Sequence, residues 1–422
     1  MLRVLSPWAL CLLLLLPWST PNALAQDTES RFEGWKDRVV QIQVMDLAAG
    51  SKAGIGSGFF AGRPGWIVSN YHVIAELVNN PGHYEARYLA DSGEEGRLTL
   101  LAVDAVHDLA LLVTDGLERP PLGMAGALPA RGARLWSMGY PFDIGLTIVE
   151  GTFNGKLQRS RLDKLHFTGS INPGMSGGPT LDEHGQVVGV NVATAGNQVS
   201  FLVPVHKVMD LLAEAPEDPG SPEHLNAMVA SQLLKNQGAI AASTLEQPLP
   251  TTRLGEYQVP AGLGDFVNCW GNSENDEENR LDLVYYACYS QDNIFLSSLF
   301  ETGIIQYQHD VVSTEALAPL RFYRQLENRS YYPRLQLNGD EHTVSNFQCQ
   351  SGFVDQEGLP MKVTYCVRHY RKHDGLFDAY LSATSLVGDQ QALQSTLVLA
   401  GFNWYNLQRF SARFLEAFSW DP

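Results

Sequence analysis

The stretch Asn172-Pro173-Gly174-Met175-Ser176-Gly177-Gly178-Pro179 decides how this chain is interpreted. A serine surrounded by glycines has little use in a packed core, but it suits an attacking hydroxyl. Gly174 can take a backbone conformation that residues with a Cβ avoid, so its N–H and that of Ser176 can point at one spot. Two converging N–H groups would stabilise the oxyanion that forms when Ser176 attacks a carbonyl. Ordinary Gly/Pro-rich turns have a similar composition, so the interpretation needs support from elsewhere in the chain.

Two upstream segments supply that support. His72 ends an apolar, β-branched run within residues 67–74, and Asp108 directly precedes the apolar run 109–112. A serine hydroxyl needs a base within hydrogen-bond reach to become nucleophilic, and histidine can be that base. A buried carboxylate fixes the tautomer of the histidine and stabilises its imidazolium. The chain order His72, Asp108, Ser176 is one in which such triads occur.

These motifs together resemble the trypsin-fold serine proteases, and most closely their HtrA (high-temperature-requirement) branch. The similarity extends from about Val39 to Leu212. The segments that carry it are Gly56–Phe60, Gly65–Ile74, His107–Leu112, Ser176–Pro179, Val187–Asn191 and Phe201–Pro204. The resemblance implies a mainly β fold with two six-stranded β-barrels, His72 and Asp108 from the first and Ser176 from the second. It implies no metal and no organic cofactor.

The same resemblance locates a substrate pocket. The residue six positions before the nucleophile forms the pocket floor in this fold, and here it is Ser170, followed by Ile171. The opposite wall is expected from Val192, Ala193 and Thr194. A neutral hydroxyl offers no charge to pair with Lys or Arg, so we expect cleavage after small or medium aliphatic residues.

Two departures from the family pattern have consequences. A Ser or Thr on the last strand commonly bonds the triad aspartate, whereas this chain has Val192 in that place. The carboxylate of Asp108 is then expected to rely on backbone N–H groups and on Ser69. Met175 stands where zymogens activated by a new N-terminus carry Asp, which argues against that kind of activation.

Residues 1–25 have the pattern of a secretory signal peptide. Arg3 precedes an apolar stretch too short to span a bilayer, and Ala23-Leu24-Ala25 resembles a cleavage site. The mature chain would start near Gln26 and be periplasmic or secreted. No later run reaches membrane-spanning length, so we expect no stable membrane insertion after removal of the signal.

Charge and cysteine content restrict the partners. The chain has 46 Asp plus Glu against 29 Lys plus Arg, which argues against nucleic-acid partners. Four cysteines follow the signal segment: Cys269, Cys288, Cys349 and Cys366. An even number in an exported chain favours disulfides, with Cys269–Cys288 and Cys349–Cys366 as cross-strand bridges, although two other pairings remain open. Zinc is the rival interpretation, but the Cys-x-x-Cys spacing is missing.

The domain organisation follows from these signals. Residues 32–213 are predicted to form the protease domain and 214–262 a linker that contains a helix. Residues 263–422 are predicted to form an α+β domain with two disulfide hairpins, suggestive of an internal duplication. The peptide-binding PDZ domain that the resemblance implies after the protease is not recognisable.

The sequence thus predicts an exported serine endopeptidase that acts on protein or peptide substrates through an acyl-enzyme. A role in protein quality control follows from the resemblance alone. The alternative is a protease-like scaffold with weak or no turnover, which binds or regulates through its C-terminal domain. The sequence does not indicate an oligomeric state.

Overall fold

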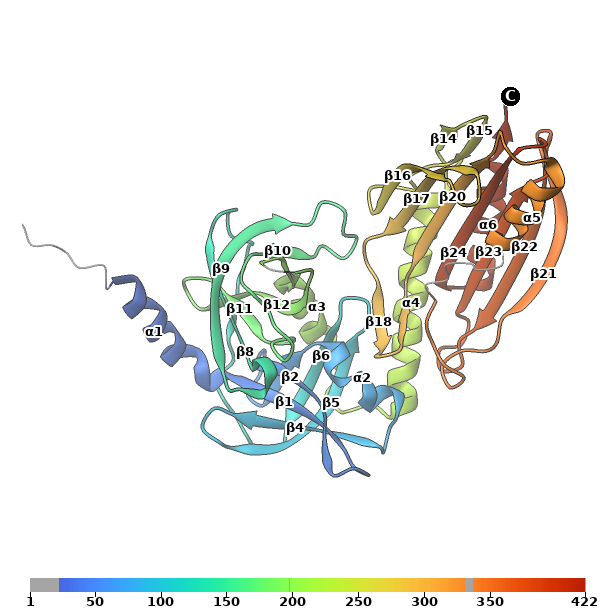
Figure 1. Cartoon of the computed structure of the whole chain (residues 1–422). Helices are drawn as coiled ribbons and strands as arrows, with labels where there is room; N and C mark the ends of the chain where they lie inside the picture. Colours follow the sequence, from blue (N-terminus) through green and yellow to red (C-terminus); the bar gives the residue numbers. More distant parts are fainter. Residues whose placement is uncertain (1–22, 197, 331–336, 422) are drawn as a thin grey trace, which may run out of the picture.

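The computed structural model describes residues 23–196, 198–330 and 337–421. Most of the predicted signal peptide, residues 1–22, lies outside the described residues, and residues 23–25 begin helix α1 (Ala23–Trp35). In the part that is described, no helix is both long and apolar enough to cross a membrane. Figure 1 shows two bodies, the first formed by the N-terminal half and the second by the C-terminal half.

The first body contains two antiparallel barrels, as predicted. Strands of the first barrel close in the order β1-β2-β3-β6-β5-β4. They are β1 (Val39–Asp46), β2 (Ser51–Phe60), β3 (Trp66–Ser69), β4 (Tyr84–Ala90), β5 (Glu95–Asp104) and β6 (Leu109–Thr114). Helix α2 (Tyr71–Asn79) follows β3 and buries Tyr71, Ile74 and Val78 against the barrel.

The second barrel follows in sequence and closes through the pairing of β11 with β12. It comprises β8 (Arg134–Gly139), β9 (Thr147–Lys156), β10 (Leu165–Phe167), β11 (Pro179–Leu181), β12 (Gln186–Thr194) and β13 (Ser200–Pro204). The short strand β7 (Gly123–Met124) pairs with β12 in parallel. Helix α3 (Val205–Glu214) ends the body and buries Val208 in the core shared with this barrel.

The predicted linker contains a 24-residue helix, α4 (Pro222–Leu245), which connects the two bodies. Pro222 opens it and the Ser221 side chain caps it, accepting from the N–H of His224 at 3.3 Å. The N-terminal half buries Val229 and Leu233 against the first barrel, and the C-terminal half buries Ile240 in the core of the second body. The sequence predicted a helix within this linker, but not that the helix packs on both bodies.

Two amide side chains of α4 strengthen those contacts. Gln232 donates to the carbonyl of Val103 at 2.7 Å and accepts from the N–H of Ala105 at 3.0 Å. Gln237 accepts from the side-chain amide of Asn406 at 2.7 Å. The helix therefore supports the turn that precedes Asp108 and holds the C-terminal body in place.

The second body is one antiparallel sheet of seven strands in the order β16-β17-β20-β24-β23-β22-β21. The strands are β16 (Val267–Asp276), β17 (Leu281–Ser290), β20 (Ile305–Ser313), β21 (Gln348–Gln356), β22 (Leu359–His369), β23 (Phe377–Ser385) and β24 (Gln391–Phe402). Helices α4 and α6 (Trp404–Glu416) cover one face, and α5 (Pro319–Ser330) packs on the other. A small sheet of β14 (Thr251–Leu254), β15 (Tyr257–Pro260) and β25 (Ser419–Trp420) completes this α+β unit.

Both predicted disulfides are confirmed, and each joins directly opposed residues of an edge hairpin. Cys269 faces Cys288 in the β16–β17 pair, and Cys349 faces Cys366 in the β21–β22 pair. Cys288 belongs to the core under α6, whereas Cys366 lies in a separate cluster. The bridges therefore pin the two edges of the sheet from opposite faces. The internal duplication stays a prediction.

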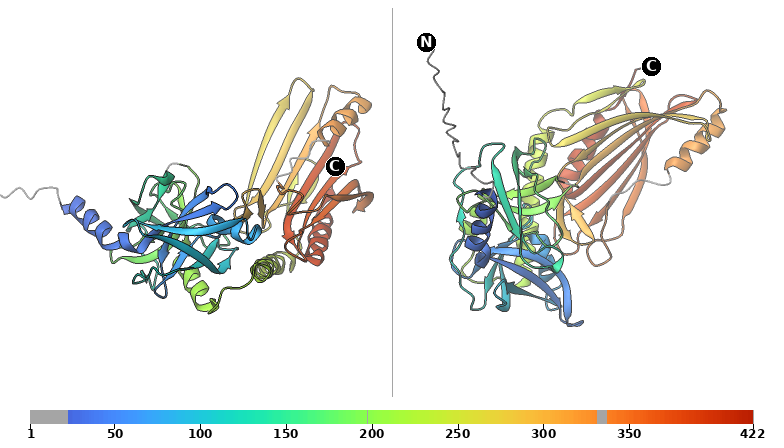
Figure 2. Two further views of the ribbon diagram at one scale, coloured as in Figure 1. Left: turned by 90° about the horizontal axis from the view of Figure 1, so that it is seen from below. Right: turned by 60° about the vertical axis from the view of Figure 1, so that its left-hand side comes forward.

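One hairpin of the second body leaves its sheet. Strands β18 (Ile294–Ser297) and β19 (Phe300–Thr302) pair only with each other among the described strands. In Figure 1, β18 descends from the C-terminal sheet toward α2, and Figure 2 shows the same two bodies side by side from other directions. Ile294 and Leu296 enter the same core as α2.

Helix α6 offers a direct test of how the C-terminal body is stabilised. Phe410 is 1% exposed in the core under α6, whereas Tyr405 on the same helix is 65% exposed. Phe410→Ala should lower the free energy of unfolding of this body by about 3–5 kcal/mol, because it removes buried apolar surface and leaves a cavity. Tyr405→Ala should change it by less than about 1 kcal/mol. Urea denaturation of the full chain measures both, and equal effects would contradict this packing.

Candidate active site

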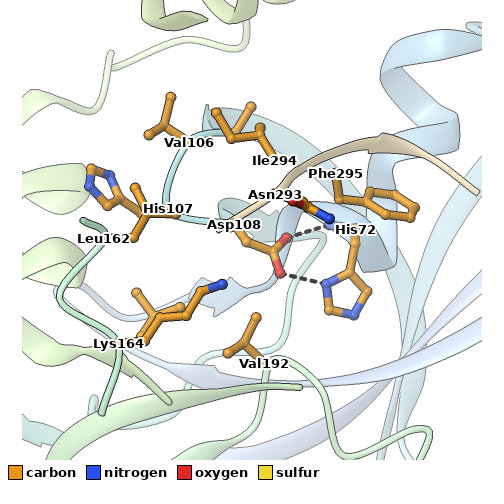
Figure 3. Close-up of a pocket in the computed structure, with 12 residues that line it drawn as sticks. His72, Val106, His107, Asp108, Leu162, Lys164, Val192, Asn293, Ile294 and Phe295 are labelled. Carbon is orange, nitrogen blue, oxygen red and sulfur yellow. Dashed lines mark hydrogen bonds and ion pairs between the residues drawn. The ribbon is translucent and has the colours of Figure 1, made fainter. Parts of the chain in front are cut away.

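The His72–Asp108 pair is the centre of the site. His72 is the second residue of α2, and Asp108 lies between β5 and β6 with a backbone φ of 57°. The Oδ2 atom of Asp108 lies 2.6 Å from Nδ1 of His72, and Oδ1 accepts the His72 backbone N–H at 2.8 Å (Figure 3). The Asn70 side chain donates to the Asp108 carbonyl at 2.7 Å, which holds this left-handed residue in place.

The backbone bond has a second consequence. Asn70 occupies the N-cap position of α2, but its side chain does not cap the helix. The Asp108 carboxylate fills that role by accepting the N–H of His72. A negative charge at a helix N-terminus is favourable, since the helix dipole and the unpaired N–H groups attract it. The carboxylate is therefore fixed relative to the whole helix, and the imidazole is oriented along with it.

The environment of His72 affects its basicity in opposite directions. Burial alone would lower the pKa of His72, whereas the charge of Asp108 and its hydrogen bond raise it. The net effect is a pKa above the usual 6.5. Such a shift stabilises the imidazolium that a general base forms during catalysis.

The loop that carries Ser176 needs its glycines. Gly174 has a φ of 96°, and a Cβ there would lie 2.3 Å from the carbonyl oxygen of Tyr140. Gly177 has a φ of 84°, and a Cβ there would lie 2.2 Å from the carbonyl oxygen of Ser57. Both positions combine left-handed backbone with close backbone approach, so only glycine fits without rearrangement.

Two buried polar residues hold this loop. Ser57 donates its N–H to the Ser176 carbonyl at 2.7 Å and its hydroxyl to the Gly174 carbonyl at 2.7 Å. Asn191 donates its amide to the Met175 carbonyl at 3.1 Å and accepts the Gly177 N–H on its backbone carbonyl at 2.9 Å. These residues were not identified from the sequence as parts of the site, although each lies in a motif that carried the resemblance.

The loop also presents two N–H groups. Met175, between them, donates its own N–H to the Asn172 carbonyl at 2.9 Å. Among the described residues, no protein acceptor takes the N–H of Gly174 or of Ser176. Both N–H groups are therefore available to an oxyanion, and their role as the oxyanion site stays a prediction.

Ser176 and His72 come from different barrels, and the loop brings their segments together. A Cβ on Gly177 would lie 2.3 Å from the hydroxyl of Ser69 and 2.9 Å from the backbone nitrogen of Asn70. The residue after Ser176 thus touches the residues that precede His72. Within the described chain, the Ser176 hydroxyl makes no direct hydrogen bond to His72. Such bonds commonly tighten only when substrate is bound.

The predicted pocket residues lie along β12 and its neighbours. The Ser200 hydroxyl accepts the N–H of Ile171 at 3.3 Å, and Ser200 pairs with Thr194 across the sheet. Ser170 is exposed, in the loop between β10 and β11. The backbone of Ala193 pairs with that of Phe201.

Val192 lies beside the His72–Asp108 pair, unlike the other predicted pocket residues. It lines one cavity together with His72 and Asp108, as Figure 3 shows. The Asp108 carboxylate is held by His72 alone among the described residues, through one ring bond and one backbone bond. The expected support from Ser69 is wrong, because its hydroxyl donates to the Ser57 carbonyl at 2.7 Å.

The neighbouring Asp104 forms a similar but separate pair. Its carboxylate accepts the N–H of His107 at 3.0 Å and contacts Nδ1 of the same residue at 2.6 Å. Asp104 therefore stabilises a turn, and its carboxylate bonds to His107 and not to His72. Among the described residues, no three His, Cys, Asp or Glu side chains cluster as a metal site would require.

One further part of the site was not predicted from the sequence. Residues Asn293, Ile294 and Phe295 of the β18 segment line the same cavity as His72 and Asp108. The ring centroids of Phe295 and His72 are 5.7 Å apart in an edge-to-face arrangement. No local motif marks this contact, because it joins two segments that are distant in sequence.

The fold has two antiparallel barrels, with a His–Asp pair from the first and a glycine-rich serine loop from the second. This combination is typical of the trypsin-fold serine proteases. Residues 56–190 match the family model described as "Trypsin-like peptidase domain". Among curated relatives, serine protease HTRA3 of Mus musculus is 28% identical over 169 residues, which cover 38% of this chain and 37% of the relative. Protease Do-like 5, chloroplastic, of Arabidopsis thaliana is 31% identical over 188 residues, covering 39% and 58%. The chain therefore contains an HtrA-like, trypsin-fold serine protease domain.

Solved structures give similar matches. The crystal structure of Deg5 is 27% identical and covers 44% of this chain and 93% of its own, with a TM-score of 0.40. The serine endoprotease from Yersinia pestis is 23% identical and covers 44% and 65%, with a TM-score of 0.39. The chain spans 37% of the length of HTRA3.

The His72–Asp108 pair predicts a pH dependence. A protonated His72 cannot accept the Ser176 proton, so kcat/KM should fall as the pH drops through the His72 pKa, with a midpoint above 6.5. Asp108→Asn removes the two effects that raise this pKa, so the His72 NMR titration should shift to lower pH. It should also lower kcat by about 10⁴-fold.

Asp104→Asn is the matched control, because its carboxylate bonds to His107 instead of His72. It should leave the acid midpoint of kcat/KM unchanged. An acid midpoint of kcat/KM that shifts in Asp104→Asn but not in Asp108→Asn would contradict the assignment of Asp108 as the partner of His72.

Proposed function

We propose that this protein is an exported serine endopeptidase that cleaves protein or peptide substrates through a Ser176 acyl-enzyme. The observation that carries the proposal is the doubly hydrogen-bonded His72–Asp108 pair, adjoining a glycine-constrained loop that presents Ser176. The similarity of residues 56–190 to the trypsin-like peptidase domain supports it.

Each residue has a defined task in the reaction. The Ser176 hydroxyl attacks the scissile carbonyl carbon while its proton passes to Nε2 of His72. The N–H groups of Gly174 and Ser176 stabilise the oxyanion, and one such donor is typically worth 10²–10³-fold in kcat. The intermediate then collapses to an acyl-Ser176, and the leaving amine takes the proton from His72. A water molecule, deprotonated by His72, attacks the ester and releases the acid, which restores the hydroxyl.

The pocket supports a preference for small or medium aliphatic residues before the cleaved bond. Ser170 contributes no charge, and Val192, which lines the cavity beside His72, adds none. Thr194 bonds its hydroxyl to the carbonyls of Gly196 and Val199, at 3.0 and 3.1 Å. Its polar atom is therefore engaged within the loop. Protein quality control is the role we propose, by analogy with the HtrA-like relatives.

Export is part of the proposal. Two disulfides favour an oxidising compartment, which agrees with the signal-like residues 1–25 and a periplasmic or secreted location. Release of a mature chain starting near Gln26 would be seen by N-terminal sequencing.

A second candidate function is a protease-like scaffold with little turnover. Two observations favour it: valine methyls instead of a hydroxyl at position 192, and the aromatic ring of Phe295 beside His72. In that case the C-terminal body would carry the biological role.

A fluorophosphonate probe separates the two functions. The probe phosphonylates only an activated serine, so the wild-type chain should be labelled and Ser176→Ala should not. Ser92→Ala is the matched control, since it removes an exposed hydroxyl in the turn between β4 and β5, away from the triad and the pocket, and should be labelled like wild type. A folded wild-type protein that resists labelling would rule out the peptidase.

A further inference from the structure

The β18–β19 hairpin is the part of the C-terminal body that reaches the catalytic residues. Phe295 lies beside His72, and Asn293 and Ile294 line the same cavity of about 260 Å³ (Figure 3). Most of the cavity wall comes from the protease domain, including Val106, Leu162 and Val192. The cavity is thus shared by the two bodies of the chain.

The hairpin is firmly attached on its apolar side. Ile294, Leu296 and Phe300 are at most 3% exposed and pack in the core that includes α2. The Asn79 side chain at the end of α2 donates to the Leu296 carbonyl at 2.7 Å. Burial of three large side chains makes the hairpin a fixed wall of the protease domain.

Polar contacts fix the start of the hairpin. Asp292 is 9% exposed, accepts the N–H of Arg161 at 2.7 Å and accepts the Ser160 hydroxyl at 3.1 Å. Its carboxylate also lies 3.2 Å from Nζ of Lys164. This ion pair neutralises Lys164, the only Lys or Arg among the described residues that line the cavity. The rest of the lining is mostly apolar.

Phe295 differs from its neighbours in the hairpin. Its side chain is only partly buried: it packs against the margin of the core that includes α2, and its ring lies edge-to-face with the imidazole of His72. The exposed part of a phenyl ring in this position is apolar surface that a substrate side chain can cover.

The free edge of β12 indicates which substrate residue would reach this ring. On one side, Ala193 and Thr194 pair with β13 and Val192 lies at a bulge between Asn191 and Ala193, while the β11 pairing on the other side ends at Val190. An extended peptide can add to that free edge as a strand. Successive side chains of a strand point to opposite faces, so when the P1 side chain enters the Ser170 pocket, the preceding P2 side chain points the other way. Val192, at the start of this free edge, lines the cavity together with His72 and Phe295, so a side chain on that face of the peptide can reach the ring.

We propose that Phe295, from the C-terminal body, forms the wall of an apolar subsite for the P2 side chain of the substrate. The inference rests on the proposed peptidase function and adds a specificity determinant to it. Large aliphatic or aromatic P2 residues should be preferred over glycine and over charged residues, because the ring and Val192 give apolar contact.

The test compares two peptide substrates that share all residues except P2, which is Leu in one and Gly in the other. Phe295→Ala should lower kcat/KM for the P2-Leu peptide by about tenfold, because it removes apolar contact, and change the P2-Gly peptide by less than about twofold. For Phe295→Leu, kcat/KM for the P2-Leu peptide should lie between the values for Phe295→Ala and the wild type. Leu299→Ala, in the turn of the same hairpin and 64% exposed, is the matched control and should change neither.

Binding gives a second readout that does not need turnover. In a Ser176→Ala background, fluorescence anisotropy should show tighter binding of the P2-Leu peptide, and Phe295→Ala should abolish that preference. Circular dichroism and thermal melting confirm that each variant is folded.

The outcomes separate this inference from the proposed function. Failure of fluorophosphonate labelling would reject the peptidase, while a P2 preference in binding would still support the subsite. An equal loss with both peptides would overturn the subsite, since the ring would then act only on His72. Faster cleavage of both peptides by Phe295→Ala would also overturn it, because the hairpin would then obstruct the cleft.

Discussion

The two hydrogen bonds between Asp108 and His72 are the constraint on which the site depends. One bond goes to the imidazole and the other to the backbone of the same residue, so the carboxylate caps α2 while it orients the ring. The cap requires Asp108 to adopt a left-handed backbone, and Asn70 holds it there. Helix α4 adds further support, because Gln232 bonds to the backbone on either side of Asp104, where the turn toward Asp108 begins.

The nucleophile loop is held by an independent set of bonds from both barrels. Ser57 in the first barrel and Asn191 in the second both bond to the segment around Ser176. A bond across the barrel interface fixes the distance between the loop and the histidine more rigidly than packing alone could. The C-terminal body adds Phe295 to this arrangement, so the environment of His72 depends on both halves of the chain.

The sequence predicted the features that are encoded locally. The glycines around Ser176 predicted a left-handed loop, the apolar runs predicted strands, and the even number of cysteines after the signal segment predicted two disulfides. It could not predict the contact of Phe295 with His72, because that contact depends on how two separately folded bodies dock. The expected role of Ser69 was wrong for a related reason: its hydroxyl, close to His72 in sequence, donates to the carbonyl of Ser57 on the neighbouring strand.

The most direct test of the central claim is a crystal structure of the protein after reaction with a fluorophosphonate. The account predicts a covalent bond from phosphorus to the Ser176 oxygen, with the phosphonyl oxygen within hydrogen-bond distance of the N–H groups of Gly174 and Ser176. Nε2 of His72 should lie within hydrogen-bond distance of the Ser176 oxygen. An adduct on another residue, or an imidazole out of reach of the modified serine, would contradict it.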